Sequence, residues 1–144
     1  MTHVDFYILQ SSEPQARLQF VTRLAEKIFH ARHQLVIATE DEQDAKSLSE
    51  QLWTDKPESF LAHALGETNP QPSEPIIVTH LEPHPHCHDV LINLTSGVLE
   101  NHFSRFQRLV EVVCQDETVL QNTRKSFAFY RERGYPIKSH KINA

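Results

Sequence analysis

The sequence predicts an α/β protein, with a mostly parallel sheet and helices on both faces, folded as a single domain over residues 1–144. Short apolar runs alternate with amphipathic segments through the first third of the chain, which is the pattern of strand–helix–strand units. The apolar runs are only a few residues long, as buried parallel strands are. The length is that of one domain with one core.

The first third supplies two strands and two helices. Residues 4–9 are apolar and rich in β-branched and aromatic types, so they predict a buried strand. A stripe of apolar residues at helical spacing predicts a helix from the turn at Pro14 to about Ala31. Residues 34–38 predict a second strand. Thr39 and Glu42 then have the spacing of a capping box at the start of another helix. The core stripe of that helix is Ala45, Leu48, Leu52 and Trp53.

The rest of the chain continues the alternation after an irregular, proline-containing stretch over 54–75. Further strands are predicted at 76–78, 90–94 and 108–114. A last helix is predicted from about Asp116 to Arg133. Gly134 is its expected C-cap, and Pro136 prevents the helix from continuing. No internal repeat or linker divides the chain.

Composition indicates a cytoplasmic protein with free thiols. The longest apolar runs are far shorter than the roughly 20 residues of a membrane-spanning helix. The N-terminus has neither the basic nor the apolar region of a secretory signal. Cys87 and Cys114 are too few for a disulfide framework.

The charge distribution reverses near the C-terminus. Residues 124–144 carry six basic side chains and one acidic side chain, a net +5, in a chain whose formal net charge is -5. The first 123 residues therefore carry 8 basic and 18 acidic side chains, or -10. Such a body repels a long polyanion over most of its surface but attracts a short acidic segment locally. We expect a docking module without strong direct nucleic-acid binding.

A histidine-rich segment is the candidate chemical site. His84, His86, Cys87 and His88 are ligand types for zinc or copper, and Cys87 between two histidines is a conceivable nucleophile. The ligands crowd into five residues, however, and no second cluster completes a tetrahedral site. We therefore expect no metal and no catalytic residues, and keep a metal- or thiol-dependent enzyme as the alternative.

Nucleotide cofactors are disfavoured by the scarcity of glycine. The chain has only Gly66, Gly97 and Gly134, and contains neither G-x-G-x-x-G nor G-x-x-x-x-G-K-[ST]. The predicted sheet is Rossmann-like, but without this phosphate-binding apparatus we expect no cofactor.

The last helix carries the most specific functional signal. Arg124 and Arg131 lie seven residues apart on one side, with the small Ala128 between them and Lys125 close by. Guanidinium groups bind carboxylates bidentately, so this face suits an acidic peptide ending in a carboxylate. Basic residues are also favoured in a last helical turn, which explains Arg131 well but Arg124 poorly.

The assembled motifs resemble the chi subunit family of the bacterial DNA polymerase III clamp-loader complex. The resemblance covers nearly the whole chain, and Leu-Trp followed by Pro-Glu-Ser-Phe is its most specific part. The matching segments are 5–9, 36–43, 52–53, 57–63, 89–94, 124–131 and 134–135.

The resemblance implies a non-enzymatic adaptor with two partners, the psi subunit and the acidic C-terminal tail of single-stranded-DNA-binding protein. The implied psi-facing residues are Trp53 and Phe60, a surface that could also serve a helicase. The chain departs from the family at Ala128, where a basic residue is typical, and at Ala62, where proline is frequent. The implied tail site is Arg124, Ala128, Arg131 and Gly134, with Tyr130 and Lys125 as neighbours. We expect the tail's terminal apolar side chain to fill a gap over Ala128, bounded by Tyr130 and Gly134.

Overall fold

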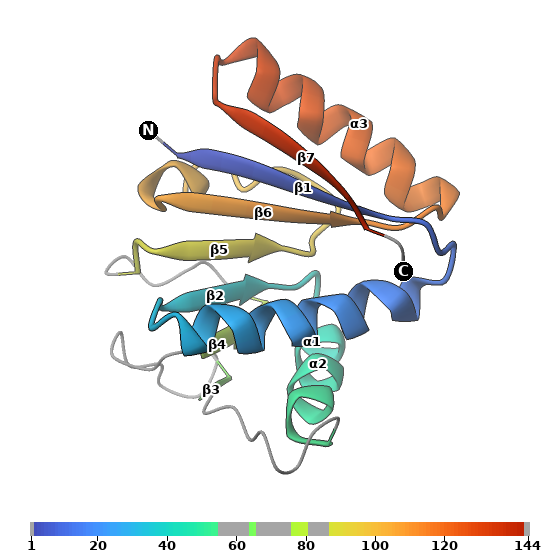
Figure 1. The fold of residues 1–144 in the computed structure, drawn as a ribbon, viewed down its shortest axis with the longest axis vertical. Coiled ribbons are helices and arrows are strands. Elements are labelled where there is room, and N and C mark those ends of the chain that lie inside the picture. Colours follow the sequence, from blue (N-terminus) through green and yellow to red (C-terminus); the bar gives the residue numbers. More distant parts are fainter. Residues whose placement is uncertain (1, 55–63, 66–75, 81–86, 143–144) are drawn as a thin grey trace.

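A seven-stranded sheet with the order β3-β4-β2-β5-β6-β1-β7 organises the protein (Figure 1). The computed structural model describes residues 2–54, 64–65, 76–80 and 87–142. All strand pairings among these residues are parallel. The strands are β1 His3–Leu9, β2 Leu35–Ala38, β3 Ala64–Leu65, β4 Ile76–Thr79, β5 Val90–Asn93, β6 Arg108–Val113 and β7 Ile137–Ile142. The helices are α1 Pro14–His30, α2 Glu42–Thr54, α3 Glu117–Glu132 and the short 3-10 helix η2 Phe103–Arg105.

The predicted fold class is confirmed, because the parallel sheet carries helices on both faces. One apolar cluster joins the sheet to α1 and α2 and contains residues such as Val21, Leu48 and Ile92. The other lies on the opposite face beneath α3 and η2, with Phe6, Phe103 and Tyr130 at its centre. Among the described residues, no helix has both the length and the apolar character needed to cross a bilayer.

Every helix and strand expected from the sequence is present, with ends that differ by a residue or two. Two strands were not expected. The short β3 pairs with β4, and β7 pairs in parallel with β1 from Val4↔Ile137 to Leu9↔Ile142. Strand β7 occupies the edge of the sheet and carries three cationic or imidazole side chains within six residues. Charged side chains are common on edge strands because they discourage pairing with other chains, but they also remove the apolar run that identifies a strand in a sequence.

The expected capping box at the start of α2 is wrong. The side chain of Asp41 caps this helix, because its Oδ1 accepts a hydrogen bond from the backbone N–H of Asp44 at 2.9 Å. The Thr39 hydroxyl is buried and donates instead to the carbonyl of Thr79 at 3.2 Å, which joins the carboxyl ends of β2 and β4. The Glu42 carboxylate pairs with Lys46 one turn later, at 2.8 Å.

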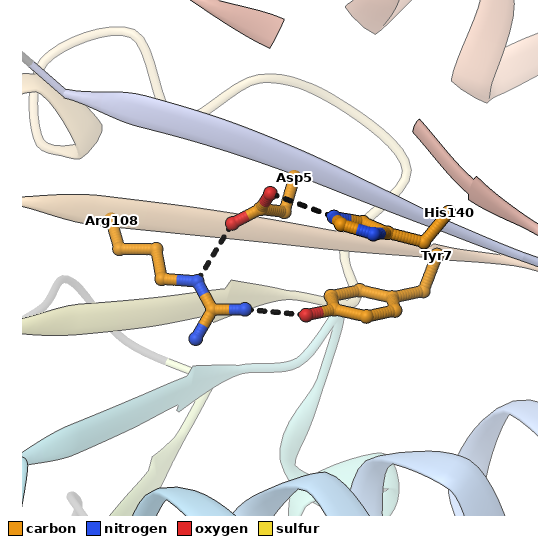
Figure 2. A network of polar contacts seen from close by, with 4 residues as sticks. All are labelled: Asp5, Tyr7, Arg108 and His140. Atoms are coloured by element: carbon orange, nitrogen blue, oxygen red, sulfur yellow. Dashed lines mark hydrogen bonds and ion pairs between the residues drawn. The ribbon is translucent and has the colours of Figure 1, made fainter. Parts of the chain in front are cut away.

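A polar network on the α1 side of the sheet ties β7 to β1 and β6 (Figure 2). The Asp5 carboxylate lies 3.0 Å from Nε2 of His140 and accepts a hydrogen bond from Nε of Arg108 at 2.7 Å. Arg108 also donates to the hydroxyl of Tyr7, whose ring stacks on the His140 ring with centroids 4.7 Å apart. Burial alone would raise the pKa of Asp5, but the bonds from His140 and Arg108 outweigh it and lower that pKa.

Candidate functional site

Helix α3 has a well-defined cap at each end. Asp116 precedes the helix and its Oδ2 accepts a hydrogen bond from the N–H of Val119 at 3.2 Å. After Arg133 the chain turns at Gly134, whose φ of 78° lies in the left-handed region that glycine adopts most easily. The N–H groups of Gly134 and Tyr135 then bond to the last carbonyls of the helix. This is the glycine C-cap expected from the sequence.

A buried carboxyl group fastens the inner side of α3 to the sheet. The Tyr130 hydroxyl donates to Oε2 of Glu111 on β6 at 2.7 Å, and the side-chain amide of Asn93 on β5 donates to the same oxygen at 3.1 Å. Complete burial raises the pKa of Glu111 to about 7. Burial and the adjacent Glu111 also raise the pKa of the Tyr130 hydroxyl. These hydrogen bonds hold α3 against the sheet with Tyr130 facing inward.

Tyr130 is therefore not a surface residue. Its side chain has no exposed area, and its ring packs against Phe103 and Phe6. The sequence placed Tyr130 at the border of a gap over Ala128, and this placement was wrong because the ring points into the core. Tyr130 orients the helix from below and does not line its outer face.

The outer face of α3 presents the basic residues expected from the sequence. Arg124, Lys125, Ala128, Arg131 and Gly134 are all exposed. Arg124, Ala128 and Arg131 follow one another at spacings of four and three residues, so they lie on one side of the helix. We call these five residues the α3 basic face.

One contact beside the α3 basic face, a cation–π pair, was not predicted from the sequence. The Arg133 guanidinium lies over the ring of Phe129 at 3.6 Å from its centroid, and its Nη1 is 3.4 Å from the Phe129 carbonyl. The ring holds this cation in place by a cation–π interaction. The spacing of four residues between Phe129 and Arg133 is the signal that could have revealed it.

An apolar groove lies beside Arg124, between α3 and the edge of the sheet. Its volume is about 290 Å³. The groove is lined by Phe6, Ile8, Val113, Leu120, Thr123, Arg124, Phe127 and Ser139. We call it the α3 groove. In β7, Lys141 aligns with Ile8 and lies two residues from Ser139, so it belongs to the same side of the sheet. The α3 groove was not predicted from the sequence, because its walls come from four separate elements.

The other sequence-predicted residues are not part of the α3 basic face. Trp53 lies in the last turn of α2, but its side chain is outside the described residues, as are Phe60, His84 and His86. Cys87 belongs to the apolar core under α3 and has no exposed area. Burial raises the pKa of the Cys87 thiol, which disfavours a nucleophilic thiolate. Among the described residues, no group of three or more potential ligands is placed to hold a metal ion.

The raised pKa of Glu111 makes the stability of the folded protein depend on pH. The folded protein retains the Glu111 proton up to about pH 7, whereas the unfolded chain loses it near the ordinary value of 4.5. The folded state thus binds more protons between these values, and the stability from this group falls as pH rises through that window. The whole shift corresponds to roughly 3 kcal/mol.

We expect Glu111→Gln to remove this dependence. Urea unfolding at pH 4.5 and pH 8 should show that the wild type loses roughly 3 kcal/mol more stability across the window than Glu111→Gln does. Glu117→Gln, at an exposed position in the first turn of α3, is the matched control and should behave as wild type. Parallel pH profiles for wild type and Glu111→Gln would contradict this assignment.

The chain is similar in sequence to proteins of one known family. The family model "DNA polymerase III chi subunit, HolC" matches residues 1–138. A DNA polymerase III subunit chi from Pseudomonas aeruginosa is 37% identical over 145 residues, covering 99% of this chain and 98% of the relative. The protein of the same description from Escherichia coli is 26% identical, covering 96% and 97%.

Solved structures with the same fold are more distant. The crystal structure of T4 UvsW matches with a TM-score of 0.68 and 10% identity, covering 99% of this chain and 42% of that one. Domain 2 of the DEAD-box helicase Mss116p, bound to an RNA duplex, matches with a TM-score of 0.64 and 13% identity. This match covers 98% of this chain and 64% of that one. At these identities the likeness concerns the fold alone.

Proposed function

The chain belongs to the DNA polymerase III chi subunit family, and we propose that within DNA replication it is a cytoplasmic adaptor without catalytic activity of its own. In this proposal it joins the psi subunit of the clamp loader to the acidic C-terminal tail of single-stranded-DNA-binding protein. The observation that carries the tail-binding part is the exposed α3 basic face next to the apolar α3 groove.

The basic face supplies attraction and orientation for the tail. The chain is acidic overall, so a cluster of exposed cations on one helix gives an acidic peptide a single favoured place to dock. Arg124 and Arg131 engage its carboxylates, and Lys125 adds a third charge. Exposed ion pairs contribute only about 0–1 kcal/mol each, so these contacts alone make a weak complex.

The α3 groove supplies the apolar part of the binding energy. It opens beside Arg124, so a peptide whose terminal carboxylate binds that guanidinium can place its last side chain between Leu120 and Phe127. Burial of one large apolar side chain contributes about 1.5–3 kcal/mol, more than any exposed ion pair on this surface. This placement replaces the gap over Ala128 that the sequence indicated.

The psi subunit is proposed to bind at the opposite edge of the sheet. Trp53 ends α2, the helix that lies at the β3–β4 side, whereas α3 lies at the β7 side (Figure 1). Both partners can therefore bind at the same time, as an adaptor requires. A helicase that used the surface of Trp53 and Phe60 would instead compete with psi.

The tail site is tested by removing both arginines. We expect Arg124→Ala/Arg131→Ala to weaken binding of a labelled acidic C-terminal tail peptide at least tenfold in fluorescence anisotropy, because two charge-assisted contacts are lost. Binding to the wild type should also weaken with salt. The matched control is Arg23→Ala/Lys27→Ala, which removes two exposed cations from α1 and should bind normally. A folded wild type that does not bind the peptide excludes the tail-docking proposal.

The departure from the family at Ala128 gives a test with the opposite sign. Ala128 is exposed between the two arginines, so a lysine there adds a cation without disturbing the core. We expect Ala128→Lys to tighten tail binding by about two- to fivefold, the effect of one exposed ion pair. The gain should disappear at high salt. Unchanged or weaker binding at low salt would place the tail elsewhere.

The psi-facing residues are tested by substitution of Trp53 and Phe60. We expect Trp53→Ala and Phe60→Ala each to reduce co-purification with psi at least tenfold, because large aromatic side chains carry much of the energy of such interfaces. Tail binding should be unaffected, which also shows that these variants are folded. Wild-type retention of psi by both variants would contradict this part of the proposal.

A further inference from the structure

A second recess lies on the other face of the sheet, where α1 leaves the edge strands uncovered. In Figure 1, α1 crosses the β2 side of the sheet, and among the described helices none lies in front of β1 or β7. The space between α1 and these strands forms a cavity of about 640 Å³, within the range of small-molecule sites. Its walls include Tyr7, Phe20, Arg23, Lys27, Arg108 and Ile142. We call it the α1 cavity.

The lining of the α1 cavity is cationic in an otherwise acidic protein. The ten residues that line it include three Arg or Lys residues and one histidine, and none is acidic. Arg23 and Lys27 are exposed on successive turns of α1, and neither forms an ion pair with another described residue. Two cations one helical turn apart, without carboxylate partners among the described residues, can both contact one bound anion.

Two carboxylates beside residues of the α1 cavity already have partners. Asp5 is paired with Arg108 and His140, and Asp89 lies 3.0 Å from Nδ1 of His33. Arg108 uses Nε and one terminal nitrogen for Asp5 and Tyr7, and Figure 2 shows its remaining nitrogen pointing away from both. The network of Figure 2 therefore holds a guanidinium in a fixed orientation and leaves its second terminal nitrogen for a ligand.

The remaining walls are apolar and aromatic. Phe20 and Tyr7 pack with ring centroids 5.3 Å apart, and Arg23 lies 6.0 Å from the centroid of Phe20. Leu24, Ile28, Ala31 and Ile142 complete the lining. A bare inorganic anion would leave this apolar surface unused. The combination of cations with aromatic side chains suits a planar ring joined to a phosphate, because such rings stack on aromatic residues and phosphates bind guanidinium groups.

We propose that the α1 cavity binds a nucleotide, with its phosphate between Arg23, Lys27 and Arg108 and its base against Phe20. The ligand is either a free nucleotide or one unit of a single strand, since both present the same chemistry. A long strand bound along the surface is disfavoured by the net charge of -5, whereas one unit meets only the local cations. This proposal goes beyond the adaptor function and does not depend on it.

A titration of the full-length chain followed by ¹H–¹⁵N NMR tests the proposal. The probes are thymidine monophosphate, thymidine, inorganic phosphate, a thymidine hexanucleotide and an acidic tetrapeptide Asp-Phe-Asp-Phe. We expect thymidine monophosphate to shift amides in the second half of α1 and in β1, β6 and β7, in a saturable manner. Thymidine and phosphate alone should bind at least tenfold more weakly, because each has only half of the recognised chemistry.

Paired variants locate the site. Arg23→Ala/Lys27→Ala should raise the dissociation constant for thymidine monophosphate at least tenfold, and Arg124→Ala/Arg131→Ala on the other face should leave it unchanged. The hexanucleotide distinguishes the two sources of the ligand. An affinity more than sixfold above the monophosphate identifies a single strand, whereas a smaller gain identifies the free nucleotide.

Three results would overturn the proposal. The first is the absence of saturable shifts around the α1 cavity with both the monophosphate and the hexanucleotide. The second is equal binding by wild type and Arg23→Ala/Lys27→Ala, with both proteins folded. The third is tighter binding of the acidic tetrapeptide than of either nucleotide probe at the same amides, which would make the cavity a peptide site.

Discussion

The geometry of the whole α3 side depends on one buried carboxyl group. Glu111 lies at the centre of the sheet face and accepts hydrogen bonds from both β5 and α3. A buried polar group without partners is costly, so the position of Tyr130 on α3 is strongly constrained. Once Tyr130 is fixed, helical periodicity decides that Arg124, Ala128 and Arg131 face solvent. A core hydrogen bond thereby orients the α3 basic face, which we propose binds the tail.

The sequence revealed those elements whose residues carry the signal locally. Strands such as β2 and β6 are continuous apolar runs, and α3 has a stripe, a capping aspartate and a glycine at its end. The edge strand β7 was missed because its pairing with β1 is non-local and its composition is polar. The α3 groove was also missed, because its lining residues come from four separate elements of the chain. The hydrogen bond of Tyr130 could not be predicted from spacing alone, because its partner Glu111 lies on a separate strand.

The two faces of the sheet use their cations differently. On α3, exposed arginines lie on the outer surface of a helix beside an apolar groove of about 290 Å³. On the α1 side, Arg108 is half-buried and oriented by Asp5 and Tyr7, at the wall of a wider recess. Convex charge favours flexible peptides that adapt to it, whereas an oriented guanidinium in a concavity favours ligands of fixed shape. The two proposed anion-binding surfaces therefore lie on opposite faces of the sheet.

The position of β1 has a consequence for how the protein is made. Strand β1 precedes the other described strands, and its described partners, β6 and β7, both follow much later in the sequence. During synthesis, β1 therefore has neither of these neighbours until residues 108–113 have left the ribosome. Non-local parallel pairing is slow to form, and unpaired apolar strands are prone to aggregate. A chain released early, before residues 137–142, would leave β1 as an exposed edge.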